Sequence, residues 1–173
     1  MNEALNNIMV RRSTKKYKPD MIPEDMLERI IAAGVAAPTA SNRQSPIIIA
    51  VTNKALRDKL SKMNAEILGS DKDPFYGAPV VLVVLADKNR STRVYDGSVV
   101  LENLQLAATA EGIGSCWIHR AKEEFETEEG KKILKDLGIE GEYEGIGHCI
   151  LGYPDNYIYP EIKKKDNYVY YAK

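Results

Sequence analysis

The sequence has few of the residues on which several common kinds of site depend. Among its 173 residues there are two histidines, two cysteines, one tryptophan and two phenylalanines. Because the histidines and cysteines are so few, and no carboxylate spacing joins them, we expect no metal site. A G-x-S-x-G nucleophile elbow is also missing, which argues against a serine hydrolase. The sequence therefore predicts neither a metal centre nor a serine nucleophile.

A strong charge of one sign and long apolar runs are missing too. The formal net charge at pH 7 is -1, so we expect no global attraction to nucleic acid or to an anionic membrane. No apolar run has the length of a membrane span, and residues 1–20 are too charged for a signal peptide. We therefore expect a cytoplasmic protein without nucleic-acid or membrane partners, in which any anion is bound by a local cluster of cations.

Length and composition favour a single domain over residues 1–173. The chain is 44% hydrophobic and 28% charged, which suffices for a core and for a solvated surface. Cys116 and Cys149 lie in apolar, strand-like runs, so we expect both to be core residues. His148 lies in one of the same runs and is expected to be a hydrogen-bonded core histidine.

The longest apolar segment with clear ends runs from Asp96 to Ile118 and predicts a helix that leads into a strand. Asp96 is expected to cap the helix, and Gly112 to end it in a left-handed conformation. Apolar side chains cover most of the circumference, so the helix should be buried on several sides, either within one monomer or along a subunit interface. Ser115 to Ile118 is predicted to be a buried strand.

Hydrophobic periodicity predicts the remaining elements. Helical spacing is present in residues 2–10, in a segment from Pro23 that Pro38 ends, and in residues 54–68. The further predicted strands are residues 46–52, 79–86 and 145–153. The glycines of the last strand do not form a dinucleotide-binding fingerprint, because the third glycine and the following helix are missing.

A basic run follows the first predicted helix. Residues 11–18 hold five cations in eight positions, namely Arg11, Arg12, Lys15, Lys16 and Lys18. In an extended segment alternate side chains share a face, so Arg11, Ser13 and Lys15 would point together. A guanidinium, a hydroxyl and an ammonium group suit a phosphate monoester. The alternative is a solvated basic turn without a ligand.

Residues 38–45 form a polar loop between the second predicted helix and the first predicted strand. Polar loops usually indicate only solvent contact. The primary amides of Asn42 and Gln44, however, offer the paired donors and acceptors that the hydroxyl groups of a ligand need.

Together these segments resemble the FMN-dependent nitroreductase family. The resemblance lies in RRSTK at 11–15, PTASNRQ at 38–44 and GSCWIHR at 114–120, and it spans nearly the whole chain. It implies an α+β fold with a central mixed sheet flanked by helices, assembled as an intertwined homodimer with two FMN sites at the interface. The tail of about residues 156–173, which ends in a Tyr/Val run with strand propensity, would reach over the partner subunit.

The resemblance also implies which residues contact FMN. Arg11, Ser13 and Lys15, with support from Arg12, match the residues that bind its phosphate and reach toward the flavin pyrimidine. Residues that match a loop contacting the FMN of the other subunit are Pro38, Thr39, Ala40, Asn42 and Gln44. The remaining matches are Asn64 at the pyrimidine, Trp117, Ile118, His119 and Arg120 along the N5 and O4 edge of the flavin, and Lys163 and Lys164 near the phosphate.

The implied activity is the transfer of a hydride from NAD(P)H to the flavin, followed by reduction of a nitroaromatic, a quinone or a similar small planar acceptor in a ping-pong scheme. No side chain is then needed as a catalytic group. Two alternatives stay open, namely a flavin-handling protein without turnover and a specialised, dehalogenase-like relative. Phe75 and Tyr76, in a polar loop at 69–77, would either roof the pocket or anchor the loop to the core.

Overall fold

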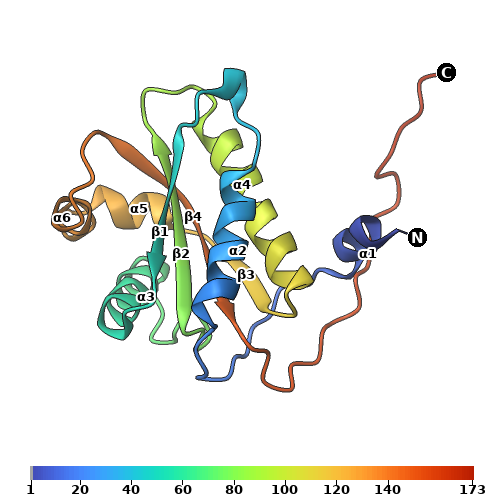
Figure 1. Cartoon of the computed structure of the whole chain (residues 1–173), viewed down its shortest axis with the longest axis horizontal. Helices are drawn as coiled ribbons and strands as arrows, with labels where there is room; N and C mark the ends of the chain where they lie inside the picture. The colour runs from blue at the N-terminus through green and yellow to red at the C-terminus, as the bar shows by residue number, and fades with distance from the viewer. Residues whose placement is uncertain (1) are drawn as a thin grey trace.

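The fold is one four-stranded sheet with helices on both faces (Figure 1). The computed structural model describes residues 2–173. In chain order the elements are α1 (Glu3–Val10), α2 (Glu24–Val35), η1 (Ala40–Asn42), β1 (Pro46–Val51), α3 (Lys54–Leu68), β2 (Val80–Asp87), α4 (Arg93–Ala110), β3 (Gly114–Ile118), α5 (Ala121–Glu126), α6 (Glu128–Asp136) and β4 (Tyr143–Gly152). The predicted α+β class is confirmed.

The sheet is antiparallel rather than mixed. Its strand order is β1-β2-β4-β3, and each neighbouring pair is antiparallel. The chain leaves the sheet at Val51 and returns beside it at Val81, so the connection through α3 does not cross the sheet. The parallel pairing that the structure shows is an isolated bridge between Ser13 and Ser115.

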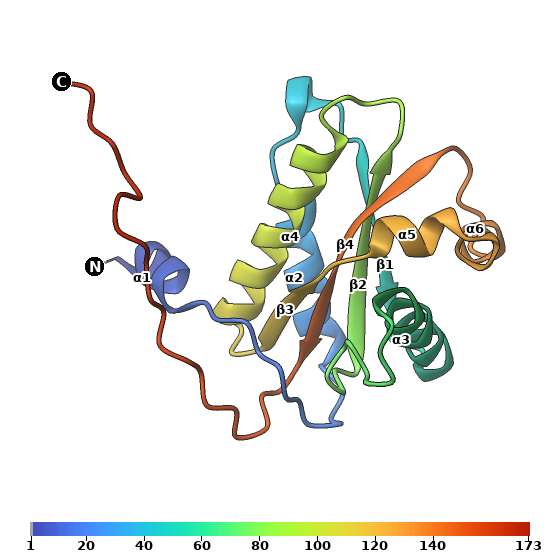
Figure 2. The same cartoon turned by 180° about the vertical axis from the view of Figure 1, so that it is seen from behind.

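Both faces of the sheet are covered, as Figures 1 and 2 show. One core cluster joins the sheet to α2 and α4, and a second joins the opposite face to α3, α5 and α6. The central strand β2 is buried on both faces from Val80 to Ala86, as predicted from its run of Val and Leu. Cys116, Cys149 and His148 are buried in the core, which confirms those predictions.

The central helix α4 begins one turn earlier than predicted. It starts at Arg93, so Asp96 lies inside the first turn, where it is buried instead of capping the helix. Gly112 adopts a φ of 72°, which confirms the predicted left-handed stop. Leu101, Leu104 and Ala108 pack into the core. The other side of the helix is not covered in one chain, because Tyr95 is 74% exposed.

The C-terminal tail runs away from the sheet, past α1, in both views (Figures 1 and 2). The predicted strand at 168–171 does not form in the single chain, where Tyr168, Tyr170 and Tyr171 are exposed. A strand needs a neighbouring edge for its main-chain hydrogen bonds, and no edge of this sheet lies beside the described tail. Among residues 2–173, no helix has the length and apolar character that crossing a membrane requires.

Candidate functional site

A cleft beside the edge strand β3 brings together residues that are far apart in the sequence. Its volume is about 390 Å³. The residues that line it are Ser13, Lys15, Leu68, Pro74, Tyr76, Cys116, Trp117, Ile118, His119 and Arg120. Six of these residues, Ser13, Lys15, Trp117, Ile118, His119 and Arg120, were predicted from the sequence to belong to one site.

The edge of β3 supplies main-chain groups to this cleft. β3 lies at the end of the sheet and pairs with β4 on one side only. On the other side the N–H of Thr14 donates to the carbonyl of Ser115 at 2.8 Å. Because the main-chain groups of a strand alternate in direction, the N–H and C=O of Trp117 face the same outer edge. They are thus placed beside the segment that carries Ser13 and Lys15.

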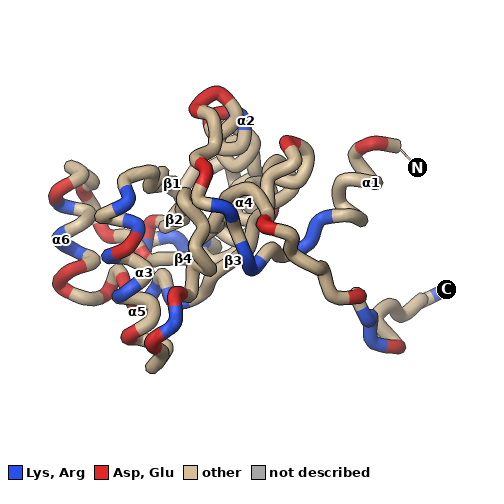
Figure 3. Tube along the Cα trace, turned by 90° about the horizontal axis from the view of Figure 1, so that it is seen from below, with Lys and Arg blue, Asp and Glu red and all other residues tan. Residues whose placement is uncertain are grey.

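Two of the three predicted phosphate ligands share one face of an extended segment. Ser13 and Lys15 are exposed and line the cleft, whereas Thr14 between them is fully buried. The side chain of Thr14 lies 3.0 Å from the hydroxyl of Tyr159, so it is held from the opposite side. This confirms the predicted alternation for Ser13 and Lys15, whereas Arg11 does not line the cleft. Figure 3 shows the basic residues along this segment next to α1.

The pKa of the Cys116 thiol is shifted by burial and by the polar and charged groups near it. Burial raises the pKa of Cys116, while the Ser13 side chain and the positive charges of Lys15 and Arg11 oppose that rise. Arg11 acts on this thiol from outside the cleft, because it is not among the residues that line it. Its Nε also lies 3.6 Å from a carboxylate oxygen of Glu102 in α4. We refer to Arg11, Ser13 and Lys15, on the segment that runs beside β3, as the basic cluster.

Arg12 does not belong to this cluster. Its Nη1 donates to the carbonyls of Met9 and Arg11, both at 2.8 Å, so the guanidinium folds back onto the end of α1. It lines a separate hollow that also includes Tyr159. In the single chain the predicted supporting role of Arg12 in the cleft therefore has no geometric basis.

Asn64 holds the end of β3 from behind. This fully buried residue donates from Nδ2 to the carbonyl of His119 at 2.9 Å, and its Oδ1 accepts from Nε of Arg120 at 3.0 Å. Both ends of the amide are thus engaged within the protein. Its position is set against the main chain, so Asn64 orients His119 and Arg120 rather than offering a free amide to the flavin. Arg120 has a φ of 76°, an uncommon conformation that these contacts support.

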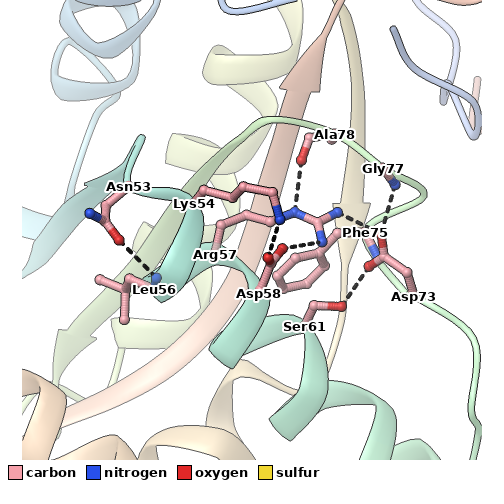
Figure 4. A network of polar contacts seen from close by, with 10 residues as sticks. All are labelled: Asn53, Lys54, Leu56, Arg57, Asp58, Ser61, Asp73, Phe75, Gly77 and Ala78. Carbon is pink, nitrogen blue, oxygen red and sulfur yellow. Dashed lines mark hydrogen bonds and ion pairs between the residues drawn. The ribbon is translucent and has the colours of Figure 1, made fainter. Parts of the chain in front are cut away.

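A polar network that the sequence analysis missed fixes the loop over the cleft (Figure 4). The Asp73 carboxylate accepts hydrogen bonds from Nη2 of Arg57 at 2.6 Å, Oγ of Ser61 at 2.5 Å, and the N–H groups of Phe75 at 2.8 Å and Gly77 at 2.7 Å. Arg57 and Asp73 are 16 residues apart, on a helix and a loop, and no local pattern in the sequence indicates that they pair.

The two aromatic residues of this loop have different positions. Phe75 is fully buried and anchors the loop to the core, whereas Tyr76 is 39% exposed and lines the cleft. Nζ of Lys15 lies 5.9 Å from the centroid of the Tyr76 ring. Of the two roles considered from the sequence, Phe75 therefore anchors the loop to the core and Tyr76 lies at the pocket.

The predicted loop at 38–44 lies away from the cleft, at the far end of α4 from α1 (cyan in Figure 1). Asp96 fixes it by accepting from the N–H of Ala40 at 3.0 Å, and from Oγ of Ser45 at 3.1 Å. Asn42 and Gln44 are exposed and have φ values of 53° and 50°. Such strained conformations persist only where the surroundings enforce them, and they are common at ligand sites.

The remaining residues of this loop have mainly local contacts. Gln44 donates through its N–H to Oγ1 of Thr39 at 3.0 Å, and through Nε2 to Oδ1 of Asn42 at 3.2 Å. Pro38 is exposed, and Ala40 begins the short helix η1. In one chain these residues form a hydrogen-bonded, solvent-facing loop that is separate from the basic cluster.

Lys163 and Lys164 are exposed on the tail. The start of the tail runs beside the basic segment, where Lys16 pairs with Asp155 at 3.0 Å. Beyond Tyr159, no hydrogen bond or ion pair joins the described tail to the rest of the chain. The structure of one chain therefore does not bring these two lysines to the cleft.

Comparison with known proteins agrees with the resemblance drawn from the sequence. The model of the nitroreductase family matches residues 8–74 and 66–153. A protein of Archaeoglobus fulgidus, provisionally named NADH dehydrogenase/NAD(P)H nitroreductase, is 34% identical over 160 residues, which cover 89% of this chain and 87% of that protein. A nitroreductase of Bacteroides fragilis, solved with bound FMN, has a TM-score of 0.92 at 27% identity, with 100% of both chains covered.

A more distant structure shows the same fold. Oxidized iodotyrosine deiodinase bound to FMN and 3-iodo-L-tyrosine has a TM-score of 0.78 at 18% identity, with 98% of this chain and 99% of that chain covered. The family match extends over most of the sequence, and the Archaeoglobus relative exceeds 30% identity over nearly the full length. The chain therefore belongs to the nitroreductase family.

Proposed function

We propose that this protein is an NAD(P)H-dependent FMN oxidoreductase that reduces nitroaromatics, quinones or similar small planar acceptors. The observation that carries the proposal is the cleft in which Ser13 and Lys15 of the basic cluster meet the end of β3. Two comparisons support it, because the Bacteroides fragilis relative holds FMN and the name of the Archaeoglobus relative refers to NAD(P)H.

The residues around the cleft suit the parts of FMN. Its phosphate requires cations and short donors, which Arg11, Ser13 and Lys15 would provide. The polar edge of a flavin needs donors and acceptors in a row, which the main chain at the free edge of β3 would supply. When bound, FMN would accept a hydride from NAD(P)H and pass the electrons to an acceptor.

The protein's own part in the reaction is to bind, orient and enclose. Asn64 holds the carbonyl of His119 and the side chain of Arg120, so the main chain that faces the cleft has little freedom to move. Tyr76 on its anchored loop forms one wall and limits the access of water. A flat flavin face with few convergent side-chain donors around it would select planar, electron-poor acceptors without distinguishing their substituents closely.

A second copy of the chain would complete the site. Apolar side chains are exposed on α1, where Leu5 and Met9 are 52% and 62% exposed, and on α4, where Tyr95 is 74% exposed. Such a set of large exposed apolar residues is expected at an interface. In a homodimer the loop with Asn42 and Gln44, and the tail with Lys163 and Lys164, would reach the cleft of the other subunit.

The test of this function begins with the cofactor. The purified protein is expected to be yellow and to release FMN on denaturation. Arg11→Ala should weaken FMN binding roughly 10- to 100-fold, because one charged partner of the phosphate is lost. Lys18→Ala is the matched control, since Lys18 belongs to the same basic run but neither lines the cleft nor, unlike Arg11, acts on Cys116 in its wall. Fluorescence titration with FMN measures both variants.

Two results would count against the proposal. The first is a purified protein that neither contains FMN nor binds FMN when it is added, which would contradict the proposed function. Rapid mixing with NADH and NADPH then separates the functional classes. If neither nicotinamide bleaches the bound flavin while dithionite does, the oxidoreductase assignment fails, and the flavin-handling or dehalogenase-like alternative replaces it.

A further inference from the structure

Behind the wall of the cleft lies a pair of buried titratable side chains. Glu124 of α5 and His148 of β4 are both fully buried, and Nε2 of His148 is 2.5 Å from Oε2 of Glu124. The other ring nitrogen, Nδ1, lies 3.3 Å from the carbonyl oxygen of Ile118. Ile118 ends β3 and lines the cleft. One main-chain carbonyl therefore links the pair to the wall of the site.

The close approach of α5 to β4 depends on a glycine. A Cβ atom at Gly145 would lie 2.2 Å from the carbonyl oxygen of Ala121, the first residue of α5. Since no side chain could fit there, the absence of one at Gly145 is what lets α5 lie against the strand and bring Glu124 to His148. Figure 1 shows α5 beside β4.

The positions of the protons follow from the partners. A carbonyl oxygen only accepts, so the hydrogen bond with Ile118 requires a proton on Nδ1 of His148. A second proton is needed on either Nε2 or Oε2, since two lone pairs would repel at 2.5 Å. The pair is then either an imidazolium with a carboxylate or a neutral imidazole with a carboxylic acid. Both forms are neutral as a whole, which makes the burial of two titratable groups tolerable.

The surroundings leave this second proton free to shift. The Phe75 ring, with its centroid 5.2 Å from that of the imidazole, is apolar. Within residues 2–173, neither carboxylate oxygen of Glu124 has a hydrogen-bond partner of regular geometry, and neither has Nε2 of His148, although Nε2 and Oε2 are close. Neither proton position is therefore fixed by a further charged group. A charge in the cleft would act on the pair through a dry interior, where electrostatic interactions are strong.

We propose that the position of the shared proton in the Glu124–His148 pair sets the dipole behind the FMN site and favours reduced over oxidised FMN. The inference rests on the proposed function. The imidazole end of the pair faces the cleft wall at Ile118, and the carboxyl end faces α5. When electrons enter the cleft, the shared proton moves from Oε2 to Nε2, which places positive charge nearer the cleft and negative charge farther from it. His148 also holds Ile118 in place, so it is a positioning residue.

The first test is the midpoint potential of the bound FMN, measured by equilibration with redox dyes. In Glu124→Gln the imidazole can no longer gain this proton. We expect the preference for reduced FMN to fall about tenfold, which lowers the potential by about 30 mV for a two-electron couple. Glu128→Gln, at an exposed residue of the neighbouring helix α6, should leave the potential unchanged. A purely structural role for Glu124 would lower stability or FMN affinity without shifting the potential.

The second test observes the unaltered protein and needs a variant, at a position outside the pair, only to assign the signals. The chain has two histidines, and ¹⁵N-labelled His119→Gln assigns the ring signals of His148. We expect these signals to move toward those of imidazolium when dithionite reduces the bound FMN. Unmoved signals, together with an unchanged potential in FMN-loaded Glu124→Gln, would overturn this inference alone. A wild-type protein that takes up no FMN would overturn the proposed function and this inference with it.

Discussion

Several polar side chains support the cleft from behind or from its edge, and Asp73 has the largest number of partners among them. Burial acts to raise the pKa of Asp73, but hydrogen bonds from Arg57, Ser61 and the N–H groups of Gly77 and Phe75 outweigh it, so the pKa lies below its ordinary value. The Arg57 guanidinium is buried and also donates from Nε to the carbonyl of Ala78 at 2.9 Å. Asp73 therefore compensates a buried charge as well as ordering the loop that carries Tyr76.

Asp73→Asn should lower the free energy of unfolding by about 1–2 kcal/mol, because the Arg57 charge loses one partner at a site that is partly exposed to water. Urea denaturation measures the change, with Asp71→Asn, on the same loop, as the control. Equal stability of Asp73→Asn and wild type would show that the network in Figure 4 does not hold the loop.

The pH dependence of this difference follows from the sign of the pKa shift. The folded pKa of Asp73 lies below the ordinary value of 3.8, so the folded state binds fewer protons than the unfolded state between the two pKa values. The stabilisation by Asp73 is complete above pH 3.8 and is lost as pH falls through the folded value. The stability difference between wild type and Asp73→Asn should therefore stay constant near neutral pH and shrink below about pH 4.

At the scale of elements, α4 connects the two halves of the proposed site. Its first turn carries Asp96, which holds the loop at 38–45, and its middle carries Glu102, which pairs with Arg11 of the basic cluster. Asp96 also accepts from Oγ1 of Thr92 at 2.9 Å. Three hydrogen bonds on one buried carboxylate fix the position of the loop against the first turn of α4.

Asp96→Ala should lower the free energy of unfolding by about 2–4 kcal/mol, because three donors lose a charged acceptor in a buried position. It should also weaken FMN binding, since the loop would no longer be held in its strained shape. Thermal unfolding and FMN titration on the same preparation measure both effects. Glu28→Gln, on the exposed face of α2, serves as the control. A destabilised variant that binds FMN like wild type would show that the loop does not take part in FMN binding.

Elements with local signals could be predicted from the sequence, and those set by distant contacts could not. The helix at 54–68 has the predicted bounds because its apolar spacing and its end at Gly69 are local features. The start of α4 was placed wrongly because Asp96 resembles a helix cap, whereas its partners come from a loop about 50 residues earlier in the chain. The resemblance implied a mixed sheet, but the sheet is antiparallel. Strand direction depends on where each connection returns to the sheet, which local sequence does not show.

The same distinction applies to the site. Alternation in an extended segment correctly placed Ser13 and Lys15 on one face, because it needs only neighbouring residues. Arg12 folds back onto α1, which a count of charges does not reveal. The pairs Arg57–Asp73 and Glu124–His148 join segments with no common spacing, so three-dimensional contacts were needed to find them.

At the scale of the whole molecule, one chain holds the two halves of the proposed site apart. The basic cluster lies at the β3 edge, and the loop with Asn42 and Gln44 lies at the other end of α4. A twofold-symmetric dimer would bring the loop of each subunit to the cluster of the other, and would form two equal sites. The exposed apolar residues of α1 and α4 would then be covered. The central claim of this account is that each FMN is held by two chains.

Complementation between two defective chains tests this claim most directly. Arg11→Ala removes part of the cluster and Gln44→Ala part of the loop, so each homodimer should retain little FMN. When the two variants are co-expressed with different tags and purified through both, each heterodimer has one doubly defective site and one intact site. We predict about one tightly bound FMN per heterodimer, half the wild-type content. A heterodimer as empty as its parents, or a wild-type protein that holds FMN as a monomer, would contradict the account.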